Sequence, residues 1–425
     1  MYIREIQIRN IRSIRRFTMT FDSEAYAGWH VVIGDNGAGK STVVRAVALA
    51  LAGVEEAPAL RQNWGEWLKV GEDEGSARIY IEHDPEFDKA TGGGKPLKNS
   101  YIDAVIQFRR SSDQSVQLSC PLHCSAKRYL WGKGRGWFCA SYGPFRRFAG
   151  GDKNFEKLFY SSPHLAPHLS AFGEDVALTE ILEWLKQLHV RALEEHETDK
   201  LVLKDLMTLV NDGKLLPHDT VLESVSSDGV LFRDGNGNRV TVNQLSDGYR
   251  SVLSMTFELI RQLVKTYGPD KVFAKIRKGE MHIDLPGVVI VDEIDAHLHP
   301  TWQKRVGAWF LQLFPKLQFI VTTHSPLVCQ AAAKGSVWRL PAPGGKRAGS
   351  RVTGGELERL LFGDLVEAYD TELFGIQSTR SEAGKEKLQR LAVLNTKARH
   401  QTLLPNEKKE LQRLRASLPT VATAE

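Results

Sequence analysis

The chain contains 425 residues, of which 42% are hydrophobic, and its 56 basic and 51 acidic side chains give a net charge of +5. This length allows one large or two medium domains with a buried core, and four cysteines exclude a disulfide framework like that of small secreted proteins. No run of eighteen apolar residues occurs and the N-terminal segment alternates isoleucine with charge, which predicts a soluble, cytoplasmic protein without a signal peptide or membrane span.

The first fifty residues predict a hairpin, a buried strand and a buried helix. Apolar and polar residues alternate over 2–8 and 17–21, as in paired half-buried strands, and the apolar run 29–33 predicts a buried strand. Residues 40–52 are apolar nearly all round, which predicts a helix enclosed inside the fold.

The segment between this strand and this helix fits the pattern G-x-x-x-x-G-K-Ser/Thr. Glycines let backbone N–H groups close around a phosphate, and the start of the following helix adds the positive end of its dipole. Lys40 is placed to reach the terminal phosphates and Ser41 to ligate Mg²⁺. The candidate nucleotide-binding residues here are Gly34, Asn36, Gly37, Gly39, Lys40, Ser41 and Thr42.

Residues 76–142 contain strand-like pieces that end with "GWFCASYG", and their glycine- and lysine-rich turns predict an antiparallel subdomain. Its cysteines raise the possibility of a zinc site, but buried free thiols are favoured because a fourth ligand is lacking. The residues concerned are Cys120, Cys124, Cys139 and the nearby His123. Beyond them, Arg146 and Arg147 could contact a nucleotide or nucleic-acid phosphate, or pair with carboxylates.

A helical region is predicted over about 153–215, and a hairpin over 229–242 because its Asp-Gly-Asn-Gly-Asn centre suits a tight turn. The following stretch, "LSDGYRS", precedes a helix that continues to about 265. Ser246 can cap this helix and Gly248 keeps its backbone open, so the helix start can accept an anion.

Two further apolar strands end in polar residues, at 288–293 and 319–326. Ligands of open α/β sheets bind at the carboxyl ends of the strands. Asp292 is therefore a candidate for holding the Mg²⁺ shell, and Glu293 for orienting or deprotonating the attacking water. His324 could bind the terminal phosphate or could be a satisfied histidine at a strand end.

The last part of the chain begins with a predicted linker at 341–350, after which about 75 residues remain. Residues 376–425 carry ten basic against five acidic side chains. This composition fits a solvated helical hairpin or a docking surface for nucleic acid or a partner protein.

Taken in order, these motifs resemble the ATP-binding-cassette (ABC) class of ATPases, and more closely its soluble branch of SMC, RecF and OLD-type ATPases. The resemblance covers about 1–340. It implies an α/β P-loop head with a mixed core sheet, an antiparallel β-subdomain, a helical insertion at about 153–215 and a helical region over 351–425. Its cofactors would be ATP and Mg²⁺.

The resemblance also implies a dimer in which two heads enclose ATP, each completing the other's site. The implied roles are nucleotide binding by Lys40 and Ser41, contact with the opposing γ-phosphate by Ser246 and Gly248, Mg²⁺ support by Asp292, catalytic base for Glu293 and switch histidine for His324. Gln107 is a candidate for the glutamine loop of the class, although an exposed glutamine on a strand is the ordinary case.

One departure from SMC-like sequences is "DEIDAHLHP", in which His299 replaces the aspartate that couples the two sites. This form looks like OLD-type and related phage-defence ATPases, and it makes His297 and His299 candidates for interface contacts. A local role is equally open, because Pro300 can start a helix directly after them. The defence ATPases also carry a stretch similar to the one with Arg146 and Arg147, and the C-terminal segments resemble those of Septu-type defence ATPases.

We therefore expect an ATP-hydrolysing switch that forms a homodimer or higher even oligomer and regulates an effector, such as a nuclease, in bacterial antiphage defence. OLD-type enzymes carry a Toprim nuclease domain after the head, and the residues after 350 are too few for one, so no nuclease activity is expected in this chain. The alternative is a DNA-binding repair ATPase of the RecF or SMC sort, with DNA or RNA as a possible partner. A transporter ATPase and a non-catalytic scaffold are further alternatives.

Overall fold

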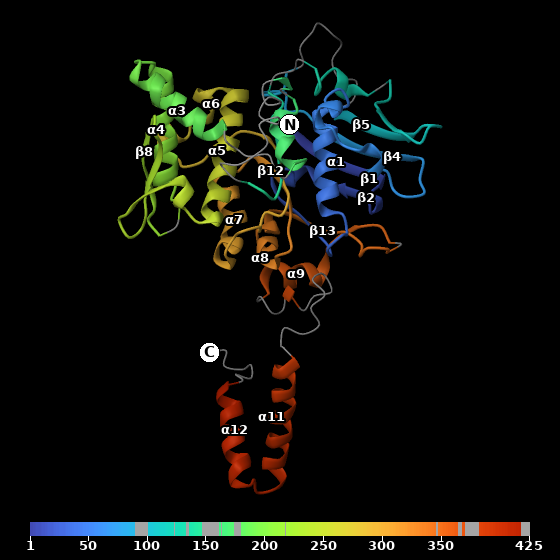
Figure 1. Ribbon diagram of the computed structural model, residues 1–425, viewed down its shortest axis with the longest axis vertical. Helices are drawn as coiled ribbons and strands as arrows, with labels where there is room; N and C mark the ends of the chain where they lie inside the picture. The colour runs from blue at the N-terminus through green and yellow to red at the C-terminus, as the bar shows by residue number, and fades with distance from the viewer. Residues whose placement is uncertain are drawn as a thin grey trace.

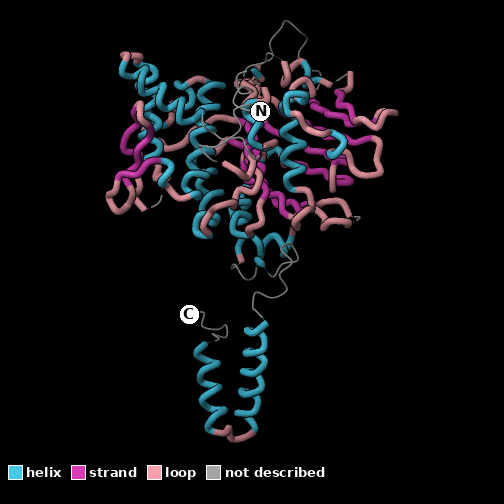
Figure 2. Tube along the Cα trace, in the orientation of Figure 1, coloured by secondary structure: helices cyan, strands magenta, loops and turns pink. Residues whose placement is uncertain are grey.

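The computed structural model describes residues 1–89, 101–122, 124–132, 136–146, 161–162, 164–173, 180–216, 218–345, 347–363, 368–369 and 382–417. The strands are β1 (Tyr2–Ile11), β2 (Ile14–Thr20), β3 (Gly28–Ile33), β4 (Glu74–Glu82), β5 (Tyr101–Arg110), β6 (Val116–Ser119), β7 (Cys139–Tyr142), β8 (Val221–Ser226), β9 (Gly229–Arg233), β10 (Arg239–Thr241), β11 (Gly287–Val291), β12 (Leu317–Thr322), β13 (Gly335–Arg339) and β14 (Ser350–Arg351). The α-helices are α1 (Lys40–Ala52), α3 (Glu180–Leu193), α4 (Glu197–Asp212), α5 (Asp247–Tyr267), α6 (Pro269–Val272), α7 (Pro300–Leu313), α8 (Pro326–Cys329), α9 (Gly354–Phe362), α11 (Glu382–His400) and α12 (Pro405–Ser417) (Figures 1 and 2).

The central layer is a six-stranded sheet in the order β14-β13-β3-β12-β11-β7. Its strands are parallel except for β14, which runs antiparallel to β13. Every residue of β3, β11 and β12 is buried, which explains why these segments are continuous apolar runs. Because the three strands are adjacent and parallel, the polar residues that follow each of them meet at one edge of the sheet.

A second sheet is antiparallel, has the order β2-β1-β4-β5-β6 and is formed by the N-terminal part of the chain. Helix α1 packs between the two sheets, and eleven of its thirteen residues are buried, so the predicted enclosed helix is confirmed (Figure 1). The predicted fold class, an α/β P-loop fold with a mixed core sheet and an antiparallel β-subdomain, is confirmed as well.

One strand lies in a different sheet from the one expected. The segment 139–142 was expected in the antiparallel subdomain, but β7 pairs in parallel with β11 at the edge of the core sheet. The reason is visible in its burial, since Ala140, Ser141 and Tyr142 are all buried and do not alternate between a buried and an exposed face.

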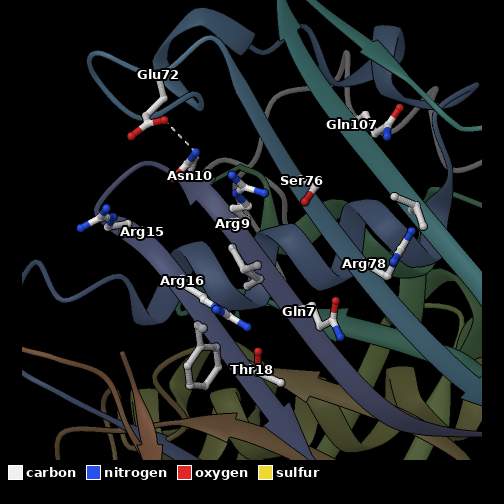
Figure 3. Close-up of a pocket in the computed structure, with 13 residues that line it drawn as sticks. Gln7, Arg9, Asn10, Arg15, Arg16, Thr18, Glu72, Ser76, Arg78 and Gln107 are labelled. Carbon is white, nitrogen blue, oxygen red and sulfur yellow. Dashed lines mark hydrogen bonds between the residues drawn. The ribbon is translucent and has the colours of Figure 1, made fainter. Parts of the chain in front are cut away.

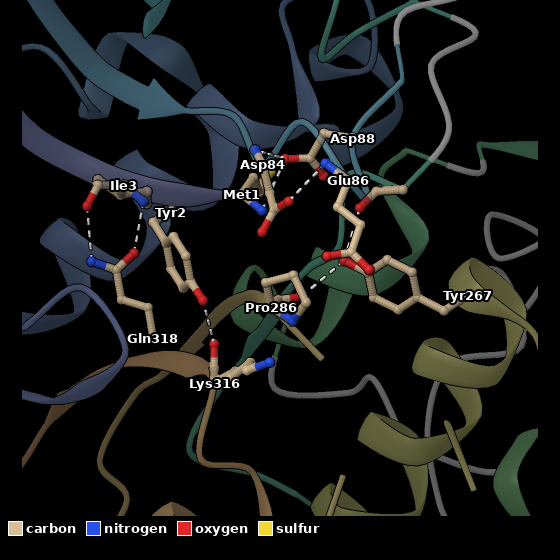
Figure 4. Close-up of polar contacts among 11 residues, drawn as sticks. Met1, Tyr2, Ile3, Asp84, Glu86, Asp88, Tyr267, Pro286, Lys316 and Gln318 are labelled. Atoms are coloured by element: carbon tan, nitrogen blue, oxygen red, sulfur yellow. Dashed lines mark hydrogen bonds and ion pairs between the residues drawn. The ribbon is translucent and has the colours of Figure 1, made fainter. Parts of the chain in front are cut away.

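A buried side chain joins the two sheets (Figure 4). Gln318 in β12 accepts a hydrogen bond from the Ile3 N–H at 2.6 Å and donates to the Ile3 carbonyl at 2.8 Å. Its amide thus pairs with β1 as a neighbouring strand would. Beside it, the Tyr2 hydroxyl donates to the Lys316 carbonyl at 3.0 Å, which fixes the end of β1 against the core sheet.

The helical region consists of α3 and α4, packed with the three-stranded sheet β10-β9-β8 and with α5 in one hydrophobic core. The predicted hairpin over 229–242 is present as β9 and β10. Its turn is held by the Asp234 carboxylate, which accepts from the backbone N–H groups of Asn236 and Asn238 at 2.9 and 2.8 Å.

The C-terminal elements are partly integrated into this core. β14 pairs with β13, and Leu360 of α9 belongs to the main hydrophobic core. Helices α11 and α12 lie side by side and share a small leucine core of their own (Figure 1). The division into a head over 1–340 and a docking region over 351–425 stays a prediction. Among the residues described, no helix is both long and apolar enough to cross a bilayer.

Candidate nucleotide site

The phosphate loop connects β3 to α1 as predicted. Gly37 and Gly39 have φ angles of 78° and 106°, a region that favours glycine. Gly39 is the N-cap of α1 and no side chain caps the helix, so the N–H groups of its first turn are open to an anion. A Cβ at Gly39 would lie 2.7 Å from the Ser13 hydroxyl oxygen, which leaves no room for a larger residue.

Lys40 folds back over this loop. Its Nζ donates to the carbonyls of Gly34 and Asp35 at 2.7 and 3.1 Å. Burial lowers the pKa of Lys40, and the carboxylates that follow β11 act in the opposite direction, as does Asp35. The three carboxylates are Glu293, Asp292 and Asp295. The structure therefore brings the lysine and the acidic turn together at one edge of the core sheet.

The acidic turn after β11 is fixed by the strand beside it. The Thr322 hydroxyl donates to Asp292 Oδ1 at 2.6 Å and accepts from the Glu293 N–H at 2.8 Å. Asp292 is only 2% exposed, whereas Glu293 is half-buried. Glu293 has φ of 46°, an uncommon conformation for a residue with a side chain, so its backbone is held in place by these contacts.

A second threonine anchors the turn that carries the predicted switch histidine. The Thr323 hydroxyl donates to Asp295 Oδ1 at 2.5 Å, and the His324 N–H lies 3.4 Å from both oxygens of the same carboxylate. The His324 side chain is exposed. It is therefore positioned by its backbone and free to contact a ligand.

The oxygen atoms in this region suit Mg²⁺. A carboxylate at Asp292 and a hydroxyl at Ser41 are ligands that Mg²⁺ takes, usually together with waters and nucleotide phosphates. Thr322 occupies only Oδ1 of Asp292 among the described contacts of that carboxylate. These two residues would hold the ion, which would neutralise phosphate charge when bound.

The signature residues lie in a separate hollow of about 720 Å³ in which none of the phosphate-loop residues takes part. Ser246 and Gly248 line it together with His297 and His299. A Cβ at Gly248 would lie 2.9 Å from the His297 carbonyl oxygen, so only glycine allows the helix start to approach this turn. Ser246 is the N-cap of α5, but its side chain makes no capping hydrogen bond, contrary to the expected cap.

The two histidines of the E-x-x-x-H-L-H-P stretch differ in role. His299 caps α7, since its Nδ1 accepts from the Thr301 N–H at 3.4 Å and lies 2.9 Å from the Thr301 hydroxyl. The local explanation thus holds for His299. His297 is exposed and has φ of 65°, and no described side chain binds it, so it stays a candidate for an interface contact.

The predicted role of Arg146 in contacting a phosphate or an interface does not fit the structure. Arg146 is 4% exposed, and all five of its N–H groups are used inside the protein. Their acceptors are the Ser251 hydroxyl and the carbonyls of Gly143, Asp292, Glu293 and Ile294. Burial lowers the pKa of Arg146 to about 10, with the nearby carboxylates opposing this shift. Arg147 lies outside the described residues.

Gln107 is also misplaced for a glutamine loop. Its neighbours Ile106 and Phe108 point into the core that contains α1. Because strand residues alternate between faces, Gln107 lies on the opposite face, away from the phosphate loop. There it lies opposite Ser76 on the neighbouring strand β4 (Figure 3).

Sequence reasoning did not assign functions to Thr322, Thr323 or Asp295. The signal was present, because two threonines directly after a buried strand must satisfy their hydroxyls at the edge where the acidic residues also lie. The possible zinc site is not supported: all four cysteines are free, no group of three metal ligands occurs among the described residues, and His123 is not among them.

Comparisons with known proteins show similarity to ATPases over much of the chain. Residues 146–330 match the family model of an AAA domain, putative AbiEii toxin, Type IV TA system, and residues 5–118 match an AAA domain model. The chain is 26% identical over 339 residues to Septu protein PtuA of Bacillus mycoides, covering 79% of this chain and 40% of that protein. It is 32% identical over 163 residues to the retron Ec83 probable ATPase of Escherichia coli, covering 35% of this chain and 28% of that protein. Over these matched segments, the chain resembles the ATPase domains of Septu and retron proteins.

The chain spans less than half the length of these curated relatives. Among solved structures, it is similar to an SMC head bound to the C-terminal winged-helix domain of ScpA. That likeness has 16% identity and a TM-score of 0.47, and it covers 83% of this chain and 97% of the other.

Proposed function

We propose that two copies of this ATPase head close around ATP and Mg²⁺ and hydrolyse the nucleotide. The observation that carries the proposal is the division of the site. Lys40, Asp292 and Glu293 gather at the edge of the core sheet, while Ser246 and Gly248 line a different hollow. A second copy that presents its signature residues would complete the binding of the γ-phosphate.

Within this arrangement, each residue has a chemical role that its surroundings support. Lys40 and the N–H groups at the start of α1 bind the phosphates, and Asp292 and Ser41 hold Mg²⁺. Glu293 accepts a proton from the attacking water, and the exposed His324 donates a hydrogen bond to the terminal phosphate. Closure on ATP and opening after hydrolysis would give the molecule two shapes.

The biological use of these two shapes is proposed from the relatives. Septu PtuA and the retron ATPases are similar over parts of this chain, which supports a role in antiphage defence. In this role, the closed and open dimers would regulate an effector protein, such as a nuclease, and the chain itself would not cut nucleic acid.

The test is to replace Glu293 with glutamine, which keeps the size of the side chain but removes the base. ATP turnover should fall by orders of magnitude while ATP-bound dimers accumulate, measured by phosphate release and by light scattering. Mixing a Lys40→Ala copy with a Ser246→Arg copy should restore one working site in each mixed dimer. Full turnover by isolated monomers, or by Glu293→Gln, would contradict the proposal.

A second candidate function, nucleic-acid binding, is favoured by the outer face of the antiparallel sheet (Figure 3). A hollow of about 640 Å³ there is lined by Arg9, Arg15, Arg16 and Arg78. Arg9 and Arg16 are directly opposite each other on β1 and β2, a like-charge pair that destabilises a sheet unless an anion lies nearby. Arg78 lies 3.4 Å from Asp103, but no described carboxylate pairs with the other three arginines.

Such a surface suits the phosphates of a nucleic-acid duplex. Arg9→Gln combined with Arg16→Gln should weaken binding of a DNA or RNA duplex and reduce its salt dependence, as measured by fluorescence anisotropy at several salt concentrations. The control is Arg109→Gln on the same sheet, because Arg109 is already paired with Glu74 at 2.9 Å. Equal binding by both variants would contradict this second function.

A further inference from the structure

Arg146 connects two elements that the ATPase reaction uses. Its Nε donates to the Ser251 hydroxyl at 3.1 Å, and Ser251 lies in α5, the helix that begins at the signature residues. The other four N–H groups donate to backbone carbonyls. These are Gly143 and Asp292 at 2.8 Å from Nη1, and Glu293 and Ile294 at 3.1 and 3.4 Å from Nη2.

These contacts hold Glu293 from both sides. Its N–H donates to Thr322 and its carbonyl accepts from Arg146. The φ of 46° at Glu293 is unfavourable for a residue with a side chain, so it depends on such contacts. The direction of the Glu293 carboxylate is therefore set in part by the position of the Arg146 guanidinium.

The guanidinium is in turn fixed to α5. The guanidinium bonds α5 through the Ser251 hydroxyl, and Ser251 lies little more than one turn after Ser246. A guanidinium is planar and rigid, so a shift of α5 would move all five hydrogen bonds together. Ser251 and Ser254 are both buried, so these contacts lie inside the protein.

We propose that Arg146 is a positioning residue that transmits the position of α5 to Glu293 of the same head. This inference rests on the proposed function, in which the start of α5 contacts the γ-phosphate bound by the opposing copy. Contact at one ATP would then align the carboxylate that acts on the other ATP. ATP hydrolysis at the two sites of a dimer would then be coordinated through the core of each head.

The decisive variant is Ser251→Ala, which removes the bond from the Arg146 guanidinium to α5. We expect kcat to fall by about tenfold, the effect of one hydrogen bond to a charged group, with KM for ATP unchanged. The matched control is Ser254→Ala. It removes a buried serine hydroxyl from the same helix. That hydroxyl donates to the backbone carbonyls of Ser251 and Arg146 at 3.1 and 3.3 Å and does not contact the guanidinium, so kcat should stay within twofold of the unchanged protein.

Arg146→Lys gives a second measurement, because lysine keeps the charge but has three donors at a single point. Its kcat should fall at least as far as that of Ser251→Ala, again with ATP affinity kept. Hydrogen–deuterium exchange of the peptide containing residues 292–298 supplies a readout that does not depend on turnover. With ATP bound, exchange should be faster in Ser251→Ala than in Ser254→Ala.

The inference is overturned if Ser251→Ala and Ser254→Ala have equal kcat and equal exchange. A loss of stability alone would lower the kcat of both variants by a similar factor, so it would not produce the expected difference between them. Failure of the proposed function has a different signature: the unchanged protein would not hydrolyse ATP, or Glu293→Gln would hydrolyse it normally. The exchange comparison would still decide the link between α5 and the acidic turn.

Discussion

Thr322→Val isolates the hydroxyl that organises the acidic turn. Valine has nearly the same shape as threonine, and the side chain at this position is fully buried, so the change removes hydrogen bonds with little change in packing. Two groups lose their partner: Asp292 Oδ1, which accepts at 2.6 Å, and the Glu293 N–H, which donates at 2.8 Å.

The expected loss of stability follows from these two groups. A buried polar group left without its partner costs about 1–3 kcal/mol, so the two together lower the free energy of unfolding by about 2–6 kcal/mol. Turnover should fall as well, because Glu293 loses the anchor of its N–H. Urea denaturation of the nucleotide-free protein and steady-state phosphate release measure the two effects.

Thr256→Val is the matched control. Thr256 is also fully buried, but its hydroxyl donates at 2.7 Å to the carbonyl of Val252 in the same helix, and that carbonyl keeps its helical hydrogen bond. The expected loss is below about 1 kcal/mol. If the two variants were equally stable and equally active, the reasoning about the Thr322 hydroxyl would be refuted.

Two further predictions concern the phosphate loop and the buried histidines. Gly39→Ala should abolish ATP binding, measured by isothermal titration, because its Cβ would lie 2.7 Å from the Ser13 oxygen and φ is 106°; retained affinity would contradict this. Burial lowers the pKa of His30 to about 4 and that of His168 to about 3, so the unfolded chain takes up protons first as the pH falls below about 6.5. Stability should therefore be intact above pH 6.5. Below it, the free energy of unfolding should fall by up to about 1.4 kcal/mol per pH unit for each histidine, down to about pH 4. Urea denaturation measures this change, and equal stability at pH 7 and pH 5 would refute the prediction.

The sequence predicted most of the core sheet and its phosphate loop because both depend on local patterns. Continuous apolar runs become β3, β11 and β12, and the glycines of the loop fix the start of α1. The polar residues after each run meet at one edge because parallel neighbours share their carboxyl ends.

What the sequence missed depends on contacts between distant segments. The short segment 139–142 does not reveal from its sequence whether it joins the antiparallel or the parallel sheet, and β7 joins the latter. Two adjacent arginines resemble a phosphate contact, but only the three-dimensional structure shows that all five N–H groups of Arg146 have internal acceptors.

The position of Gln107, in contrast, can be worked out from the sequence alone. Ile102, Ala104, Ile106 and Phe108 alternate along the strand and fill the core, so an odd-numbered residue between them must face away. Strand alternation alone therefore places Gln107 on the face away from the phosphate loop.

The amide of Gln318 has a consequence for how the chain is made. It provides hydrogen bonds to Ile3 across a separation of 315 residues. At about 5–20 residues per second, a ribosome needs roughly 15–60 seconds to reach this position after the first strand has emerged. During that interval β2 and β4 can already pair with β1, but the contact that joins Ile3 to the core sheet cannot form until β12 has been made, so the two sheets are joined late in synthesis.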